Sequence, residues 1–369
     1  MRNETPTVAS RDISAVTLPR AVFGLVIAGI VIFTLAAVVI VRDRVREFQN
    51  ATLEQAVTLR TDAAGLAFAR ALDQDWQLLQ AIAGDMAALD RDQLRAVLNA
   101  AAGTEERVSW AGFAAPDGTV VAASDGLLEG GDVSARPWFR RGLQGPFAGD
   151  VHDALLLAEA IPEGPYGPAR FLDMAAPVVN QGSRTEGVLG FHINAGWARD
   201  FLTEFARTAQ IDLLLVNPEG DVVVATGEDI PERLDLPSLR AAAAGIAAAG
   251  RETWPDGTAY FTTVLPSVTH GGLPSFGWRL VGRMEIQGFA LTPGAELVHV
   301  SALAVLLGGA LYLVLALVFV RVYLSPLTGL VHTAGRMAEG QEAYPDEVRA
   351  PAEAQRLSAA LARLEATRN

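Results

Sequence analysis

The segment VSWAGFAAPDGTVVAAS, residues 108–124, has the pattern of a strand, a tight turn and a second strand. In the turn, Pro116 presets φ and Gly118 accepts a positive φ. The same pattern recurs in IDLLLVNPEGDVVVAT, residues 211–226, whose turn glycine is Gly220, 102 residues after the first. A repeat of this size predicts two similar modules that combine helices and strands, rather than one large domain.

Each predicted module contains two further strands. In the first module, residues 170–179 and 187–195 are β-rich and a short polar turn separates them. In the second, residues 258–266 and 278–284 flank a loop with two glycines and a proline, which is typical of a hairpin. Residues 195–208 are predicted to form a helix between the modules. The sequence therefore indicates two antiparallel-sheet modules in tandem.

Two uncharged apolar runs, residues 21–41 and 297–320, flank this region. At about 1.5 Å rise per residue, each is long enough to cross a hydrocarbon core of about 30 Å as a helix. The first run is interpreted as an uncleaved anchor rather than a signal peptide, because its apolar core exceeds the usual length of about 7–15 residues and no clear A-x-A site follows. The pattern predicts a two-pass membrane protein with residues 42–296 as one large domain.

Charge bears on orientation and partners. The N-terminal tail 1–20 carries three arginines and the C-terminal segment 321–369 carries six, so both are expected to be cytoplasmic, although three arginines directly after the first run argue the other way. Residues 42–296 contain 20 arginines against 34 acidic residues, which argues against a nucleic-acid partner. The absence of cysteine excludes disulfides and fits an exported bacterial domain. We expect a bacterial inner (cell) membrane protein whose large domain is periplasmic or extracellular.

A long helix is predicted to follow the first apolar run. Leu72, Trp76, Leu79, Ala83 and Met86 step by four, three, four and three residues along one helix face. A shorter second helix is predicted to follow, so that helical structure covers most of residues 42–103.

Several short motifs resemble the double Cache sensor family. They are DVSARPWF (132–139), APV (176–178), GVLG (187–190) and GWRLV (277–281). The resemblance covers residues 42–295 and implies an α+β fold with two tandem PAS-like antiparallel-sheet modules on a long N-terminal helix, between two transmembrane helices. The expected boundaries are 42–103 for the long helix, 104–196 for the distal module and 208–290 for the proximal module.

Arg136, Trp138 and Phe139 form the clearest candidate ligand site. A guanidinium offers a rigid fork of donors suited to a carboxylate, and neighbouring aromatic rings can wall a pocket and exclude water. The resemblance implies that this arginine holds the carboxylate of the ligand, as in the amino-acid-binding members of the family. The alternative is that both aromatic residues are core and that Arg136 fixes a loop.

The same resemblance places an acidic residue, which pairs with the ligand ammonium, after the G-V-x-G strand. His192 stands there, and Phe139 replaces the more usual tyrosine. An imidazole cannot pair with an ammonium as a carboxylate does, so a carboxylate ligand without an amine is expected, although Asp150, Asp153 or Asp173 could restore an anion. His192 could also be a packed strand residue. The candidate ligand-binding residues are Arg136, Trp138, Phe139, Asp153, Asp173, His192 and Trp110.

Metal binding and catalysis have little support in the sequence. Asp150, His152, Asp153 and Glu159 include possible metal ligands, but His152 and Asp153 are adjacent and would point to opposite faces of a strand. No third ligand is evident, so no metal and no cofactor are expected. Nucleophile-elbow, zinc-protease and P-loop motifs are all absent from the sequence, so we do not expect an enzyme.

The C-terminal segment 321–369 has two runs of heptad spacing. Leu327, Leu330, Ala334 and Met337 step by three, four and three residues, and Ala354, Leu357, Leu361 and Leu364 repeat the pattern. With Pro326 and Glu353 near the helix starts, the segment resembles a HAMP linker, although the family's glycine after the acidic residue is missing. The alternative is a plain pair of amphipathic helices. A HAMP linker implies a parallel four-helix bundle and hence a homodimer.

These features together predict a membrane-bound extracytoplasmic ligand sensor for signal transduction. We expect it to bind a small-molecule ligand, an organic acid or amino-acid-like compound, in the distal module. The signal would pass through the second span to a relay and on to a possible separate cytoplasmic output protein. The alternative is a membrane-anchored solute-binding or scaffold protein with no signal output. The predicted relay residues are Pro326, Leu327, Leu330, Glu353 and Leu357.

Overall fold

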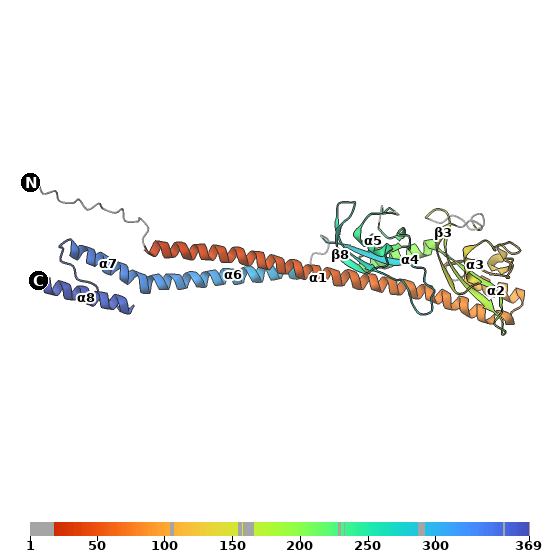
Figure 1. The fold of residues 1–369 in the computed structure, drawn as a ribbon, viewed down its shortest axis with the longest axis horizontal. Helices are drawn as coiled ribbons and strands as arrows, with labels where there is room; N and C mark the ends of the chain where they lie inside the picture. Colours follow the sequence, from red (N-terminus) through yellow and green to blue (C-terminus); the bar gives the residue numbers. More distant parts are fainter. Residues whose placement is uncertain are drawn as a thin grey trace, which may run out of the picture. The chain divides into compact units, whose positions relative to one another are not determined.

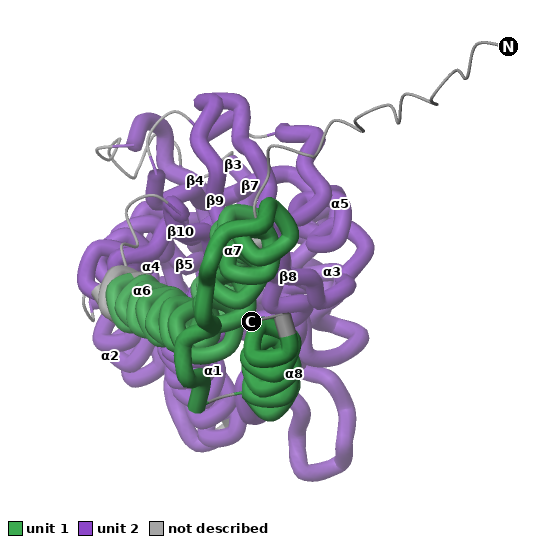
Figure 2. Tube along the Cα trace, turned by 90° about the vertical axis from the view of Figure 1, so that its left-hand side faces the viewer, with its two compact units in different colours: residues 1–49, 291–369 green, residues 50–290 purple. Residues whose placement is uncertain are grey.

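A computed structural model gives the structure of the chain. It forms two compact units, one of residues 50–290 and one of residues 1–49 with 291–369 (Figure 2). Each unit is described by itself below. The structure describes residues 18–103, 107–153, 157, 166–227, 230–231, 233–286, 292–349 and 351–368.

Residues 50–290 contain two five-stranded antiparallel sheets (Figure 1). The first has the spatial order β2 (Val120–Ala123), β1 (Val108–Ala114), β5 (Thr185–Asn194), β4 (Arg170–Val179), β3 (Phe147–Asp153). The second has the order β7 (Val222–Ala225), β6 (Asp212–Val216), β10 (Arg279–Glu285), β9 (Ala259–Leu265), β8 (Ala248–Thr253). The two sheets share one topology, so the predicted tandem of similar modules is confirmed.

The two repeated turns have the same backbone geometry. Gly118 has φ of 92° and Gly220 has φ of 89°, in the region that favours glycine. A Cβ on Gly118 would also lie 2.7 Å from the backbone nitrogen of Ser134. The turn chemistry read from the sequence is therefore the reason that each module starts with a β1–β2 or β6–β7 hairpin.

Each module also has one strand and one helix that the sequence did not indicate. They are the edge strands β3 and β8, and the short helices α3 (Pro137–Gly142) and α5 (Pro237–Ala243), each of which has proline in its first turn. Both edge strands are largely solvent-accessible along their length, so they lack the apolar alternation that marks a half-buried strand. The predicted connecting helix is α4 (Ala195–Ala209).

The helical region before the first sheet is divided. Helix α1 (Leu18–Asp85) is followed by a 3₁₀ turn at Met86–Ala88 and by α2 (Arg91–Ala102). The side chain of Asp90 accepts a hydrogen bond from the backbone nitrogen of Gln93, and the Gln93 side chain accepts one from the Asp90 nitrogen. This capping box starts a new helix, so the predicted shorter second helix is confirmed as α2.

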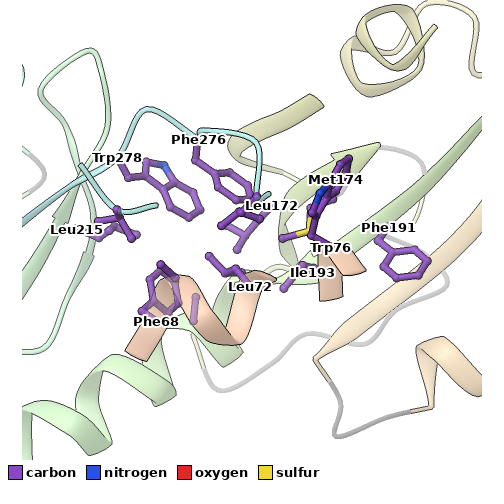
Figure 3. Close-up of a cluster of buried hydrophobic side chains, with 14 of the residues drawn as sticks. Phe68, Leu72, Trp76, Leu172, Met174, Phe191, Ile193, Leu215, Phe276 and Trp278 are labelled. Atoms are coloured by element: carbon purple, nitrogen blue, oxygen red, sulfur yellow. The ribbon is translucent and has the colours of Figure 1, made fainter. Parts of the chain in front are cut away.

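The predicted apolar face of α1 lies in the core that both sheets share (Figure 3). Leu72, Trp76 and Leu79 are fully buried there. The ring of Phe68, also on α1, lies 6.2 Å from that of Trp278, which precedes β10, and Trp278 stacks on Phe276 at 4.1 Å. Residues of both sheets thus pack on one helix: Leu172, Met174, Phe191, Ile193, Leu215 and Trp278.

A polar link also joins the two modules. One carboxylate oxygen of Asp150, on β3, accepts a hydrogen bond from the indole nitrogen of Trp278 at 2.7 Å. The other accepts one from the side-chain nitrogen of Asn217, after β6, at 3.0 Å. Trp278 and Asn217 are buried, so this carboxylate satisfies two donors that water does not reach.

The second unit contains the helices that are apolar enough to cross a membrane. Among the described residues there are two such helices: the start of α1, and α6 (Thr292–Phe319) with its continuation. A π-helical turn (Val320–Leu324) joins α6 to α7 (Ser325–Ala338), and Pro326 lies in the first turn of α7. Because proline cannot donate a backbone hydrogen bond, the wider turn accommodates it at this junction.

Helices α7 and α8 (Ala352–Arg368) run in the same direction and pack through a small core (Figure 1). From the predicted seam, this core contains Leu327, Leu330, Ala334, Met337, Ala354 and Leu361. Leu357 and Leu364 lie outside it and are 40% and 62% exposed. Glu353 is exposed in the first turn of α8.

Candidate ligand-binding site

The first module contains a cavity of about 440 Å³. Five of the seven predicted ligand-binding residues line it, and the other two, Trp110 and Phe139, are buried in its wall. Elements β3, β4, β5 and the start of α3 supply these lining residues. The five are Arg136, Trp138, Asp153, Asp173 and His192.

Helix α3 positions the arginine and the tryptophan. Arg136 directly precedes this helix, and Pro137 occupies its first turn. The Trp138 ring lies against β5 at Gly190, where a Cβ would be 2.8 Å from the ring. Phe139 meets Trp138 edge-on at 5.9 Å and lies in the same core cluster. The G-V-L-G motif thus serves close packing of this helix on the sheet.

The strand register brings the predicted residues together. His192 on β5 pairs with Trp110 on β1 and with Asp173 on β4. Its imidazole is sandwiched between Trp110, at 4.8 Å, and Phe171, at 5.4 Å. Trp138 contacts the edge of the imidazole at 5.8 Å. His192 is therefore both a packed residue and a residue that lines the cavity.

Asp173 binds two imidazoles through one oxygen. The Oδ1 atom of this buried carboxylate lies 2.6 Å from Nδ1 of His192 and 2.9 Å from Nε2 of His152. Burial raises the pKa of Asp173, but the charge of His192 and the hydrogen bonds from both imidazoles outweigh it, and the pKa falls to about 2. Asp173 is therefore a carboxylate at neutral pH.

His152 donates from both ring nitrogens. Its Nε2 faces the Asp173 carboxylate, and its Nδ1 lies 3.0 Å from the backbone oxygen of Asp153. Both partners can only accept, so both nitrogens must carry a proton. The hydrogen bond to Asp173 raises the pKa of His152, while burial and the charge of Arg136 lower it by less. These contacts thus favour the imidazolium form of His152.

This geometry predicts a pH-dependent stability. Because the pKa of His152 is raised on folding, its stabilising contact is fully present below its ordinary pKa of about 6.5 and is lost as the pH rises through the higher folded value. The melting temperature of the protein should therefore exceed that of the His152→Ala variant at about pH 5.5, and the difference should shrink towards about pH 8.5. The exposed His332→Ala change is the control, and a difference that does not vary with pH would contradict the assignment.

The other acidic residues near the cavity are engaged elsewhere. Asp150 accepts from Trp278 and Asn217, as described above. Asp153 is 77% exposed and lies 3.5 Å from Arg170. Glu159 lies outside the described residues. A spare buried carboxylate for a ligand ammonium is therefore not present among the described residues that line the cavity.

The sequence did not indicate that His152 and Phe171 line the cavity. A register shift between Gly149 and His152 interrupts the pairing of β3 with β4, so strict alternation does not hold. The shift lies before His152 and Asp153, whose side chains keep the expected opposite directions: His152 contacts Phe171 and Asp173, and Asp153 lies near Arg170. Only the pairing partner of β3 could have placed His152 beside Asp173.

The second module has an arginine at the position of His192. Arg283 on β10 pairs with Asp212 on β6 and Thr262 on β9, the same strand positions that surround His192. Its guanidinium donates to Asp212 at 3.0 Å and lies 4.0 Å from the Trp254 ring and 4.2 Å from the Tyr260 ring. An arginine paired with an acidic residue thus occupies the register position that His192 has beside the cavity of the first module.

Solved structures that this chain resembles include ligand-binding domains of bacterial receptors. The ligand-binding domain of the amino acid chemoreceptor PctB of Pseudomonas aeruginosa PAO1, in complex with L-arginine, has a TM-score of 0.50 and 14% identity over 65% of this chain and 98% of that domain. The domain of chemoreceptor CtaA of Pseudomonas fluorescens, in complex with L-leucine, has a TM-score of 0.48 and 15% identity over 67% and 98%.

An extracellular ligand binding receptor from Desulfohalobium retbaense is a further match, with a TM-score of 0.45 and 13% identity over 63% of this chain. The match spans 40% of that receptor's chain. No protein-family model matches the sequence, and no curated protein matches it.

The fold is that of a Cache-type extracellular sensor domain, with two tandem PAS-like sheets on a long N-terminal helix. The two apolar helices fit a two-pass membrane receptor. At this low sequence identity, the similarity shows the fold but does not show the ligand.

Proposed function

We propose that this protein is a membrane-bound extracytoplasmic sensor that binds a small carboxylate-bearing metabolite in the cavity of its first module. One observation carries the proposal: Arg136 lines a cavity in which Asp173, the one buried carboxylate among the described lining residues, is already paired with His152 and His192. A guanidinium in a partly dry cavity favours a carboxylate. Trp138 and Phe171 add apolar surface for the body of the ligand.

The proposed ligand differs from those of the solved neighbours. Those domains were determined with amino acids, L-arginine and L-leucine. An amino acid also needs an anion for its ammonium group, and here an imidazole stands on β5 while Asp173 is paired. An organic acid without an amine therefore fits the described cavity better than an α-amino acid does.

The membrane arrangement is proposed from the charge pattern and the helices. Residues 1–20 and 321–369 are assigned to the cytoplasm and residues 42–296 to the periplasm of a bacterial inner-membrane protein, with spans at 21–41 and 297–320.

Helices α7 and α8 are proposed to be a HAMP-like linker that dimerises. Leu357 and Leu364, which the α7–α8 core leaves exposed, would pack against a second copy in a parallel four-helix bundle. The signal would then be a difference in ligand affinity between two states of this bundle, read by a separate cytoplasmic output protein. A scaffold that transmits nothing is the rival, and cross-linking of residues 326–368 that finds only monomers would favour it.

The test of the ligand proposal is a thermal-shift screen of the 369-residue chain in detergent against organic acids and amino acids. A ligand at 100 times its dissociation constant should stabilise the protein by about 2.7 kcal/mol. Arg136→Ala should abolish the shift, because the carboxylate loses its charged donor. Arg140→Ala, on the next turn of α3 and away from the cavity lining, is the matched control and should keep it. An unchanged shift in Arg136→Ala would overturn the proposal.

A further inference from the structure

The cluster of His152, Asp173 and His192 brings three possible metal-ligand atoms to one point of the cavity. Three strands that are neighbours in one sheet supply the residues: β3, β4 and β5. Their ligand atoms lie within 4.8 Å of one another. All three residues line the cavity, so a small solute can reach the cluster.

We propose that His152, Asp173 and His192 form a binding site for a divalent transition-metal ion such as Zn²⁺. Two imidazole nitrogens and one carboxylate oxygen are the donor set that such ions prefer. The proposal concerns the same cavity as the carboxylate site but does not depend on it. A metal ion alone is the ligand considered.

The separations of the donor atoms suit a single ion. Two ligands bound at about 2.1 Å from one metal lie about 3.0–3.4 Å apart in octahedral or tetrahedral geometry. The nitrogens of His152 and His192 lie 2.9 and 2.6 Å from Oδ1 of Asp173. Binding thus requires each nitrogen to move away from Oδ1 by less than an ångström, and the part-exposed His152 side chain is the one free to adjust.

The hydrogen bond on the far side of His152 provides an independent observation. The Nδ1–H of this residue donates to the backbone oxygen of Asp153 at 3.0 Å. In metal sites the non-ligating nitrogen of a histidine commonly makes this kind of contact, which leaves the other nitrogen directed at the metal. Here that other nitrogen, Nε2, faces the carboxylate, so a bound metal ion would replace the proton between the two groups.

The aromatic surroundings fix the second histidine. Trp110 and Phe171 stack on its two faces, and Trp138 contacts its edge. The imidazole of His192 therefore cannot turn away from Asp173 without a clash. Pre-organisation of this kind lowers the cost of assembling a metal site. The guanidinium of Arg136, which lines the same cavity, opposes a dication by charge repulsion, so a micromolar affinity is expected.

The test is calorimetric titration of the tag-free 369-residue chain in detergent with ZnCl₂, followed by Co²⁺ absorption spectra. We expect one saturable site per chain and a Co²⁺ spectrum typical of nitrogen and oxygen ligands. Asp173→Asn and His192→Phe should each weaken the affinity on the order of 100-fold or more, since loss of groups that only orient ligands already costs about 10–100-fold. His192→Phe keeps an aromatic ring between Trp110 and Phe171, which protects the fold.

Controls make each outcome decisive. His332→Ala, an exposed histidine in the other unit, should leave the affinity unchanged. Arg136→Ala should bind Zn²⁺ more tightly, although the same change is expected to abolish binding of the organic acid. If a core variant does not fold, His152→Ala, whose side chain is 43% exposed, provides the same comparison. Absence of saturable Zn²⁺ binding, or equal binding by folded Asp173→Asn or His152→Ala, would overturn the metal site and leave the organic-acid result unaffected.

Discussion

Replacing Trp278 with alanine is expected to lower the free energy of unfolding by about 3–5 kcal/mol, the largest loss we expect from a single truncation. The indole is 1% exposed, stacks on Phe276 and lies against Phe68 of α1. Its removal leaves a cavity where the second sheet meets the long helix, and it leaves one of the two carboxylate oxygens of Asp150 without its donor. Urea unfolding followed by circular dichroism measures the change.

Two further variants separate packing from hydrogen bonding at this position. Trp278→Phe keeps much of the stacking but removes the indole donor, so it should lose about 1–2 kcal/mol. Tyr344→Ala removes an aromatic ring that is 64% exposed and should change the stability by at most about 0.5 kcal/mol. A loss for Trp278→Ala no greater than that for Tyr344→Ala would show that this contact does not hold the sheet on the helix.

Asp150→Ala is expected to cost about 2–5 kcal/mol, because it leaves two buried donors, on Trp278 and Asn217, without an acceptor. Asp150 also lines the cavity, so the change should alter the ligand-induced thermal shift as well as the basal stability. The same unfolding measurement applies. Asp153→Ala, three residues along the same strand and 77% exposed, is the matched control and should cost about 0–1 kcal/mol. Equal effects of the two changes would contradict the link.

Much of the fold could be predicted from local chemistry. The P-x-G turns at Gly118 and Gly220 need a positive φ, and the strands on both sides carry apolar side chains at the expected spacing. The face of α1 with Leu72 and Trp76 is buried as predicted. The edge strands β3 and β8 escaped prediction because solvent reaches most of their residues, so their sequences show no burial pattern.

The candidate site was only partly predictable. Arg136, Asp173 and His192 are marked by motif and residue type, and the structure brings them to one cavity. Trp110 and Phe139 are buried in its wall and do not line it. The sequence could not show this, because a motif does not distinguish a ring that lines a pocket from one that supports it. The contact of His152 with Asp173 depends on a register shift in β3, which no local signal encodes.

In the second module, the side chain of Arg283 occupies a position that a free cation could otherwise take. Its guanidinium is held by Asp212, Trp254 and Tyr260 at an effective concentration that is millimolar or higher for a short tether. A free cation such as an amine would have to exceed that concentration to displace it. The position between Asp212, Trp254 and Tyr260 is therefore closed to dilute cationic solutes as long as Arg283 occupies it.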